Sequence, residues 1–208
     1  MIMLPPAFVE LFCQDCVLEL QRSCCPEGSV VLRIAVAVAA FIAVVLVFAA
    51  TKPNTFRVQR SAVIDAPAER IFVLVNDFHN WYRWAPQDKE DSTMRRTYSG
   101  AQSGRDAVSE WQSNGSAGRG RMSIIESVPP TRISVETDFT KPFVAHNLNE
   151  FVLEPAGSGT RVTWTMQGTN LYLMKIMGTF VNMDRMMGKH FETGLNSLKT
   201  VAETEKTP

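Results

Sequence analysis

The sequence predicts an α+β protein in which one transmembrane helix precedes a curved antiparallel sheet wrapped on a long C-terminal helix. Three observations support this prediction. The run at 30–50 has 21 residues and a single charge. Apolar and polar residues then alternate in short segments separated by turn signals, which is typical of antiparallel strands. From residue 171 to about 203 the apolar residues recur every three or four positions, which is typical of an amphipathic helix.

Composition narrows the classes of function. Of the 208 residues, 45% are hydrophobic and 20% are charged, as in folded proteins, so disorder over most of the chain is excluded. The 21 cationic residues balance the 21 anionic ones. No nucleic-acid partner is expected, because neutralising phosphates requires an excess of Lys and Arg.

The run from Val30 to Ala50 is interpreted as a transmembrane helix, because a helix of that length spans about 30 Å, the thickness of a bilayer core. Its one charge, Arg33, lies one turn inside the end and can reach the headgroups. A buried core helix and a cleaved signal peptide are the alternatives. Lys52, Arg57 and Arg60 follow the span closely, and Arg22 and Arg33 precede or enter it, so the positive-inside rule favours a cytoplasmic C-terminal domain on a single-pass membrane protein by about one charge.

The chain around this helix divides into further predicted segments. Residues 1–29 form a tail that is expected to be disordered and holds all four cysteines: Cys13, Cys16, Cys24 and Cys25. Metal binding or redox cycling, palmitoylation near the span, and incidental thiols are all open interpretations of these cysteines. Residues 51–55 form a linker, 56–203 the folded domain and 204–208 a C-terminal tail.

The elements of the folded domain follow from its periodicities. Alternation at 56–64 predicts a strand, and Asp65-Ala66-Pro67 with Glu69 is typical of a helix start. Trp81 and Trp84 follow on a second short helix or turn. Further strands are predicted at 95–98, 107–112, 120–128, 132–139, 145–153 and 160–167.

The segment 171–203 is predicted to be one long helix. Gly178, Gly188 and Gly194 weaken it and permit close approach of another element. A curved antiparallel sheet must bury one face, and this helix is the element large enough to cover it.

Several short motifs occur along this order of elements: Phe56–Ser61, Asp65-Ala66-Pro67, Asn76-Asp77-Phe78 with Trp81, Trp84 and Pro86, Arg96–Gly100, Gly120-Arg121-Met122, Lys141-Pro142-Phe143, Ala145-His146-Asn147, Gly159–Trp164 and Met183-Asp184. Over residues 53–203 they resemble the START/Bet v 1-like helix-grip superfamily, and within it the polyketide cyclase/dehydrase-type branch. The resemblance implies a helix-grip fold. The superfamily includes lipid carriers, hydrophobic-hormone binders, aromatic cyclases and relatives of the Hsp90 ATPase activator, so the fold does not decide the function.

The resemblance also implies a cavity between the sheet and the C-terminal helix, and strand parity indicates what lines it. The expected lining combines aromatic rings, methionines and a few polar groups: Trp84, Trp111, Thr137, Asn149, Phe151, Trp164, Met166, Phe180, Met183 and Met187. Flexible, polarisable methionines in a mostly apolar lining suit an apolar or lipid-like small molecule. The alternative for each residue is ordinary core packing.

No catalytic residue is assigned from the sequence. His146 lies on the outward parity of its strand, whereas Asn147 and Asn149 face inward and can orient a carbonyl but cannot exchange protons. His190 lies at the edge of the helix's apolar stripe. No clustered metal ligands or phosphate loop occur, so neither a metal nor a cofactor is expected.

The leading hypothesis is therefore a membrane-anchored binding module for an apolar or amphipathic small molecule. A cyclase/dehydratase-type enzyme is the first alternative, and it requires a buried acid or base in the cavity. A protein-interaction module is the second alternative, and it requires an exposed apolar patch that a protein partner would cover.

Overall fold

The structure is a computed structural model that describes residues 27–86, 91–115, 117–170 and 172–204. The chain divides into two compact units, residues 1–51 and residues 52–208. The cysteine-containing part of the predicted tail lies outside the described residues.

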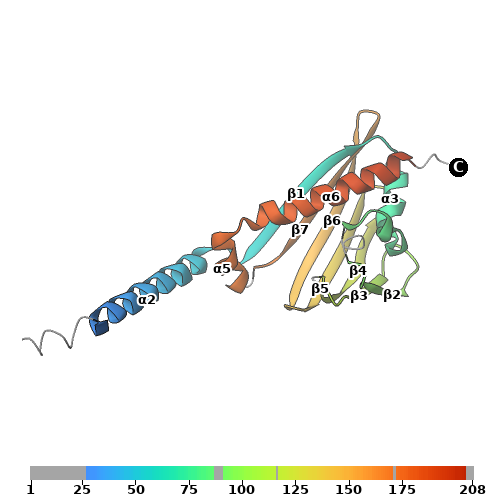
Figure 1. Ribbon diagram of the computed structural model, residues 1–208. Coiled ribbons are helices and arrows are strands. Elements are labelled where there is room, and N and C mark those ends of the chain that lie inside the picture. Colours follow the sequence, from blue (N-terminus) through green and yellow to red (C-terminus); the bar gives the residue numbers. More distant parts are fainter. Residues whose placement is uncertain (1–26, 87–90, 116, 171, 205–208) are drawn as a thin grey trace, which may run out of the picture. The chain divides into compact units, whose positions relative to one another are not determined.

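The first unit contains the apolar helix α2, which spans Glu27–Thr51 (Figure 1). Its segment Val30–Thr51 is long and apolar enough to cross a membrane, a property that N-terminal signal sequences share. None of its most apolar window is buried, whereas the core helix of a soluble protein would be mostly buried. The chain therefore carries one apolar helix near its N-terminus that fits a span or a signal sequence.

The second unit is built on a curved antiparallel sheet. Within the described residues this sheet has seven strands in the order β1-β7-β6-β5-β4-β3-β2, so β1 pairs with β7 and the other strands pair with their neighbours in sequence. The predicted antiparallel meander is confirmed, with strand ends that differ by a few residues. The strands are β1 (Thr55–Ile64), β2 (Arg95–Gly100), β3 (Ala107–Gln112), β4 (Arg119–Val128), β5 (Arg132–Lys141), β6 (Ala145–Ala156) and β7 (Gly159–Thr169).

Two short helices connect β1 to β2 and close one end of the domain. Helix α3 spans Ala68–Asn76 and follows the predicted Pro67 start, and the 3-10 helix η2 spans Phe78–Arg83. The Trp81 Nε1–H donates to the carbonyl oxygen of Val75 at 2.9 Å, and the Trp84 Nε1–H donates to that of Leu74 at 3.0 Å. Both indoles are buried, so these hydrogen bonds satisfy polar groups that would otherwise be costly inside the core.

The predicted long C-terminal helix is divided into α5 (Tyr172–Phe180) and α6 (Met183–Thr204). The division has a local cause at Asn182. The Oδ1 atom of Asn182 accepts a hydrogen bond from the backbone N–H of Arg185 at 3.0 Å, and its carbonyl accepts from the N–H of Met186 at 3.1 Å. This is the geometry of a helix N-cap, so a new helix begins at Met183 although the apolar periodicity continues across the break.

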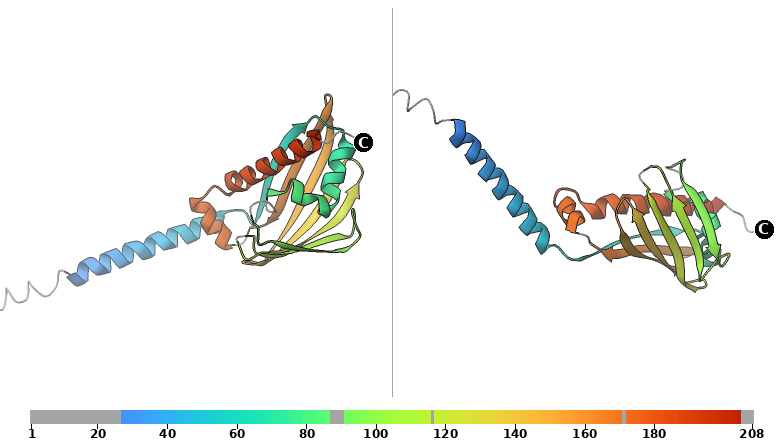
Figure 2. Two further views of the ribbon diagram at one scale, coloured as in Figure 1. Left: turned by 45° about the vertical axis from the view of Figure 1, so that its right-hand side comes forward. Right: turned by 90° about the horizontal axis from the view of Figure 1, so that it is seen from below.

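Helix α6 lies along one face of the curved sheet (Figure 2), and its C-terminal part forms the core with that face. The ring of Trp164 on β7 stacks on Phe191 of α6, with centroids 4.2 Å apart and an interplanar angle of 3°. Phe151 stacks on the same indole at 5.0 Å, and Trp84 meets it edge-on at 6.0 Å. The described hydrophobic core cluster lies entirely within residues 52–208, so this unit has a core of its own.

The N-terminal part of α6 contacts the sheet through an ion pair. Arg60 lies on β1 among the inward positions, and its guanidinium bonds Asp184 at 3.0 Å and Glu192 at 2.9 Å. A Cβ on Gly188 would lie 1.9 Å from Arg60 Nη2, so the glycine leaves room for the guanidinium beneath the helix. The predicted close approach at Gly188 is therefore an approach of Arg60.

Gly120 of β4 lies opposite Trp111 of β3, and the indole ring covers it. A Cβ at this position would lie 2.3 Å from Trp111 Cη2 and 2.4 Å from the carbonyl oxygen of Asp138. We expect G120A to lower the free energy of unfolding of residues 52–208 by about 3 kcal/mol, because the backbone oxygen cannot move aside. Urea denaturation followed by tryptophan fluorescence measures this loss.

The matched control is G157A, because no atom lies within 4 Å of a Cβ built on Gly157. Its φ of 63° is still unfavourable for alanine, and we expect a loss of about 1 kcal/mol. Equal losses in the two variants would show that the contacts of Trp111 and Asp138 do not restrict position 120.

Candidate functional site

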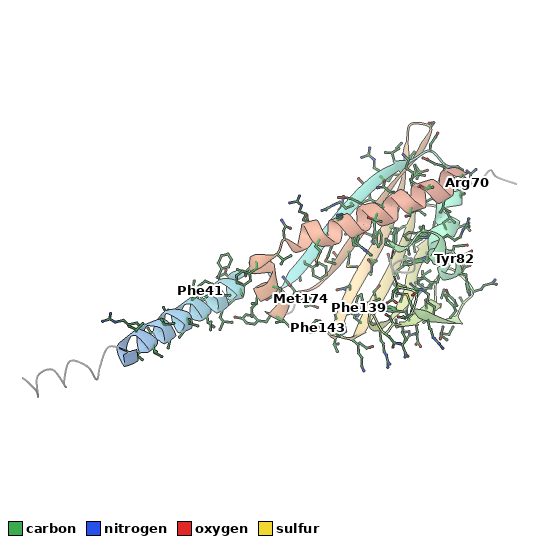
Figure 3. The ribbon with its side chains drawn as sticks, viewed as in Figure 1. Phe41, Arg70, Tyr82, Phe139, Phe143 and Met174 are labelled. Atoms are coloured by element: carbon green, nitrogen blue, oxygen red, sulfur yellow. The ribbon has the colours of Figure 1, made fainter. Side chains whose placement is uncertain are left out.

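The main cavity of the domain lies between the C-terminal helices and one end of the sheet, and its volume is about 980 Å³. Its apolar walls come from β1, β5, the β5–β6 connection, α5 and the first turns of α6. Figure 3 shows Phe139, Phe143 and Met174 toward this end of the domain, with Arg70 and Tyr82 toward the other. The apolar lining comprises Phe56, Val58, Phe139, Phe143, Met174, Phe180, Val181, Met186 and Met187.

A second, inner cavity of about 100 Å³ adjoins the main one, because Ala117 and Phe139 line both. Its polar wall is a chain of hydrogen bonds across the sheet. The Trp164 Nε1–H donates to Asn149 Oδ1 at 3.1 Å, and the Asn149 amide donates to Thr137 Oγ1 at 2.9 Å. These buried polar groups therefore satisfy one another and hold their side chains in fixed orientations.

The ten predicted lining residues lie in the inner cavity, in the main cavity or in the aromatic core, apart from Met183. Trp111, Thr137, Asn149, Trp164 and Met166 line the inner cavity. Phe180 and Met187 line the main cavity, while the side chain of Met183 lies outside the described part of the structure. Trp84 and Phe151 are fully buried in the aromatic core cluster and line neither cavity. Strand parity thus places residues on the inner face but does not separate core from cavity.

Several lining residues of the main cavity are not among the predicted ones. Lys52 directly follows the apolar helix in the chain, Arg57 lies on β1, and Lys175 is the one charged residue of α5. A lone lysine within an otherwise apolar helical segment is the signal that would have drawn attention to Lys175. Asn147, an inward position in the sequence, is 7% exposed and lines the same cavity.

The charges around the main cavity are unequal. Among the described lining residues the cations are Lys52, Arg57 and Lys175, and the one carboxylate is Asp184. Asp184 is paired with Arg60, whose guanidinium pKa is raised above its ordinary value by hydrogen bonds to Asp184 and then to Glu192. The lining therefore carries an excess of positive charge.

The mouth of the main cavity has an apolar rim. Phe143, Phe180, Val181 and Met186 all line the cavity and are all exposed, with 66% of Phe180 accessible. Exposed apolar side chains continue around them, namely Val144 of the β5–β6 connection and Leu173 and Met177 of α5. Contiguous exposed apolar residues of this kind mark an interaction surface.

The described cavity linings contain no histidine, and their one carboxylate is already in an ion pair. His146 lies on the opposite face of the sheet, where its Nδ1 contacts Asp138 at 2.5 Å and its Nε2 contacts Glu136 at 3.0 Å. Within the described ranges, no group of three or more His, Cys, Asp and Glu side chains could hold a metal ion. What the arrangement offers is an apolar space with cationic and amide groups on its wall.

An antiparallel sheet that curves around a C-terminal helix and encloses a cavity defines the helix-grip, or Bet v 1-like, class of folds. Residues 55–203 match the model of the family described as polyketide cyclase / dehydrase and lipid transport. The chain belongs to that family. The description covers both catalysis and carriage, so membership supports a ligand-binding module or a cyclase.

Solved structures show the same fold at low sequence identity. A protein from Chromobacterium violaceum is 18% identical, with 74% of this chain and 100% of that one covered and a TM-score of 0.51. The di-domain ARO/CYC protein StfQ of the steffimycin biosynthetic pathway is 10% identical, with 72% and 51% covered and a TM-score of 0.55. Ara h 8.0201 is 11% identical, with 73% and 99% covered and a TM-score of 0.52. No curated protein matches this chain.

The contacts of His146 predict a pH dependence of stability. Hydrogen bonding to Asp138, and then the charges of Asp138 and Glu136, raise the pKa of His146 above its ordinary 6.5. A raised folded-state pKa contributes stability that is fully present below pH 6.5 and is lost as the pH rises through the folded value. We expect the stability advantage of wild type over H146Q to be largest at acidic pH and to vanish at alkaline pH.

Urea denaturation of both proteins over a pH series measures this difference. H79Q is the control, since His79 lies in η2 and contacts Asp77 rather than the β5 carboxylates. A wild-type advantage that grows as the pH rises would contradict the assignment.

Proposed function

We propose that this protein is a membrane-anchored binding module for an apolar or amphipathic small molecule held in the main cavity. The observation that carries the proposal is the space of about 980 Å³ between the sheet, α5 and α6. Small-molecule sites have volumes of about 300–1,000 Å³ and mostly apolar linings with a few polar groups. The volume and lining fit one lipid-sized molecule.

The position of the cavity along the chain supports loading from a bilayer. Lys52 lines the cavity and is the first residue after Val30–Thr51, the candidate membrane span. If that helix spans a membrane, the chain places Lys52 at the interface, where the exposed rim of Phe143 and Phe180 can contact lipid. Lys52, Arg57 and Arg60 favour a cytoplasmic domain under the positive-inside rule.

An enzyme of the cyclase or dehydratase type is less well supported by the same cavity. Such a reaction requires an acid or a base within hydrogen-bond reach of the substrate. Among the described lining residues, Asp184 is the one carboxylate and is engaged by Arg60 at 3.0 Å. Protein interaction through the rim is the other alternative, and a deep cavity behind an apolar patch favours a small molecule over it.

Organic extraction of purified residues 52–208, followed by mass spectrometry, tests the proposal. We expect about one apolar or amphipathic molecule per chain in wild type. A145W is expected to lose it, because Ala145 lines the main cavity on β6 and an indole there fills the space. A156W is the matched control on the same strand, since Ala156 lines neither cavity, and it is expected to keep the ligand. An empty wild-type extract with no uptake of a fluorescent lipid would remove the proposal.

The rim generates a separate prediction about lipid contact. We expect F180D to reduce binding of residues 52–208 to phosphatidylcholine vesicles severalfold, because a carboxylate cannot enter the interface as a phenyl ring can. Y82D is the matched control, since Tyr82 of η2 is 65% exposed, close to the 66% of Phe180, and lies away from the rim (Figure 3). Vesicle co-sedimentation measures both variants. Equal losses would show that the rim has no special role in lipid contact.

A further inference from the structure

We propose that the main cavity selects an acidic amphiphile, a molecule with a carboxylate or phosphate head on an apolar chain, and that Lys175 pairs with this head. The inference rests on the proposed function and adds the chemical class of the ligand. Three observations lead to it: the burial of Lys175, the inverted polarity of α5, and the charge of the cavity wall.

Lys175 is a buried cation that has no anionic partner among the described residues. It is 6% exposed, and its Nζ donates to Asn54 Oδ1 at 2.5 Å. No ion pair joins Lys175 to any carboxylate among the residues that the structure describes. A neutral amide oxygen satisfies one of the three ammonium donors and none of its charge, and a buried charge without a counter-ion is costly. An anionic head group would supply that counter-ion.

Helix α5 buries its charged residue and exposes apolar ones, which is the reverse of the pattern in an ordinary surface helix. Lys175 is its buried residue, whereas Leu173, Met177 and Phe180 are exposed. A helix that served only to cover the sheet would bury its apolar side chains and expose its lysine. The inversion has a physical reason if the apolar side contacts lipid and the inward lysine contacts a ligand's head group.

The wall of the cavity has the electrostatics that an anion requires. Arg57 and Lys52 line it together with Lys175, and the one described lining carboxylate, Asp184, is neutralised by Arg60. The Lys52 ammonium donates to the carbonyl of Gly178 at 2.7 Å, whereas the exposed Arg57 guanidinium donates to Gln59 Oε1 at 3.1 Å on the outward parity of β1. A ligand with a cationic head would face a lining that has more cations than carboxylates among the described residues.

Asn147 provides a second polar point on the sheet side of the same cavity. The residue is 7% exposed, and its Oδ1 is buried without a hydrogen-bond partner within the described structure. Gly168 lies opposite on β7, and a Cβ there would lie 2.1 Å from this oxygen, so the glycine makes room for the amide. Unpaired buried polar groups are rare in proteins, and because Oδ1 is an acceptor it would pair with a hydrogen-bond donor of the ligand, such as a hydroxyl, and not with the anionic head itself.

The test uses the full chain in phosphatidylcholine nanodiscs and two photo-crosslinking probes, a 16-carbon fatty acid with a mid-chain diazirine and its methyl ester. The pH is about 8, well above the ordinary carboxyl pKa of about 4, so that the acid is ionised. We expect the acid to label the cavity walls about tenfold more than the ester, the ratio that one charge-assisted pair provides. Peptide mapping locates the labelled residues.

Variants at position 175 separate head-group recognition from a structural role. K175M keeps the length of the side chain and is expected to bring the acid-to-ester ratio to about one. K175R restores the charge and is expected to restore the ratio. K189M is the matched control, because Lys189 is an exposed residue of α6 that does not line the cavity.

The outcomes distinguish this inference from the proposed function. Wild type that labels equally with acid and ester in the cavity overturns the inference and leaves the binding module standing, and so does K175M with an unchanged ratio. Failure of both probes to label the cavity overturns the proposed function itself. Competition by palmitate, hexadecyl phosphate and hexadecanol then identifies the head group, and equal competition by all three also overturns the inference.

Discussion

The stacking of Trp164 on Phe191 divides the space beneath the C-terminal helix. The two rings lie 4.2 Å apart and nearly parallel, and Phe151 and Trp84 complete the aromatic cluster around them. Each aromatic pair contributes about 0.5–1.5 kcal/mol beyond the burial of its area. Because this cluster holds the C-terminal part of α6 against the sheet, the N-terminal part can meet β1 through the Arg60 ion pairs and leave the main cavity open beside it. The cavity exists where the aromatic cluster ends.

The break between α5 and α6 at Val181–Asn182 also helps to keep the cavity open. An unbroken helix would continue the line of α6, whereas the Asn182 cap allows α5 to take its own direction over the open end of the sheet. Arg60 reinforces the junction from below, since its ion pairs with Asp184 and Glu192 hold the first turns of α6 to β1. Both contacts are polar, so they position the helices without filling the cavity with apolar side chains.

The fold was predictable from the sequence because its signals are local and agree with one another. Alternation at 132–139 and 160–167, and the Pro67 helix start, are consistent with the strands and the helix observed there. The break in the C-terminal helix was not predictable from periodicity, because the apolar spacing continues through Asn182 and the competing signal is one side-chain cap. Inward residues such as Trp111 and Asn149 were predictable by parity, since a strand has a period of two.

The contents of the site were less predictable, for a physical reason. Parity shows which side chains face inward but carries no information about packing density, so Phe151 and Trp164 look alike in sequence although only Trp164 borders a cavity. The main cavity also depends on where α5 lies, which the sequence pattern does not determine. Lys175 was missed because a helical lysine is ordinarily exposed, and its burial follows from the inversion of α5.

The proposed membrane tether would complement the open cavity in this chain. A cavity of about 980 Å³ with an exposed apolar rim would be a liability in a freely diffusing protein, because such patches favour aggregation. If the preceding helix spans a bilayer, the same rim has an apolar surface to contact, and ligands concentrated in that bilayer reach the cavity at a high effective concentration. High intrinsic affinity is then unnecessary, and discrimination among membrane components becomes the more important property. A buried lysine on the wall of an otherwise apolar cavity suits that need, because a charge adds little to general lipid affinity and strongly separates acidic from neutral ligands.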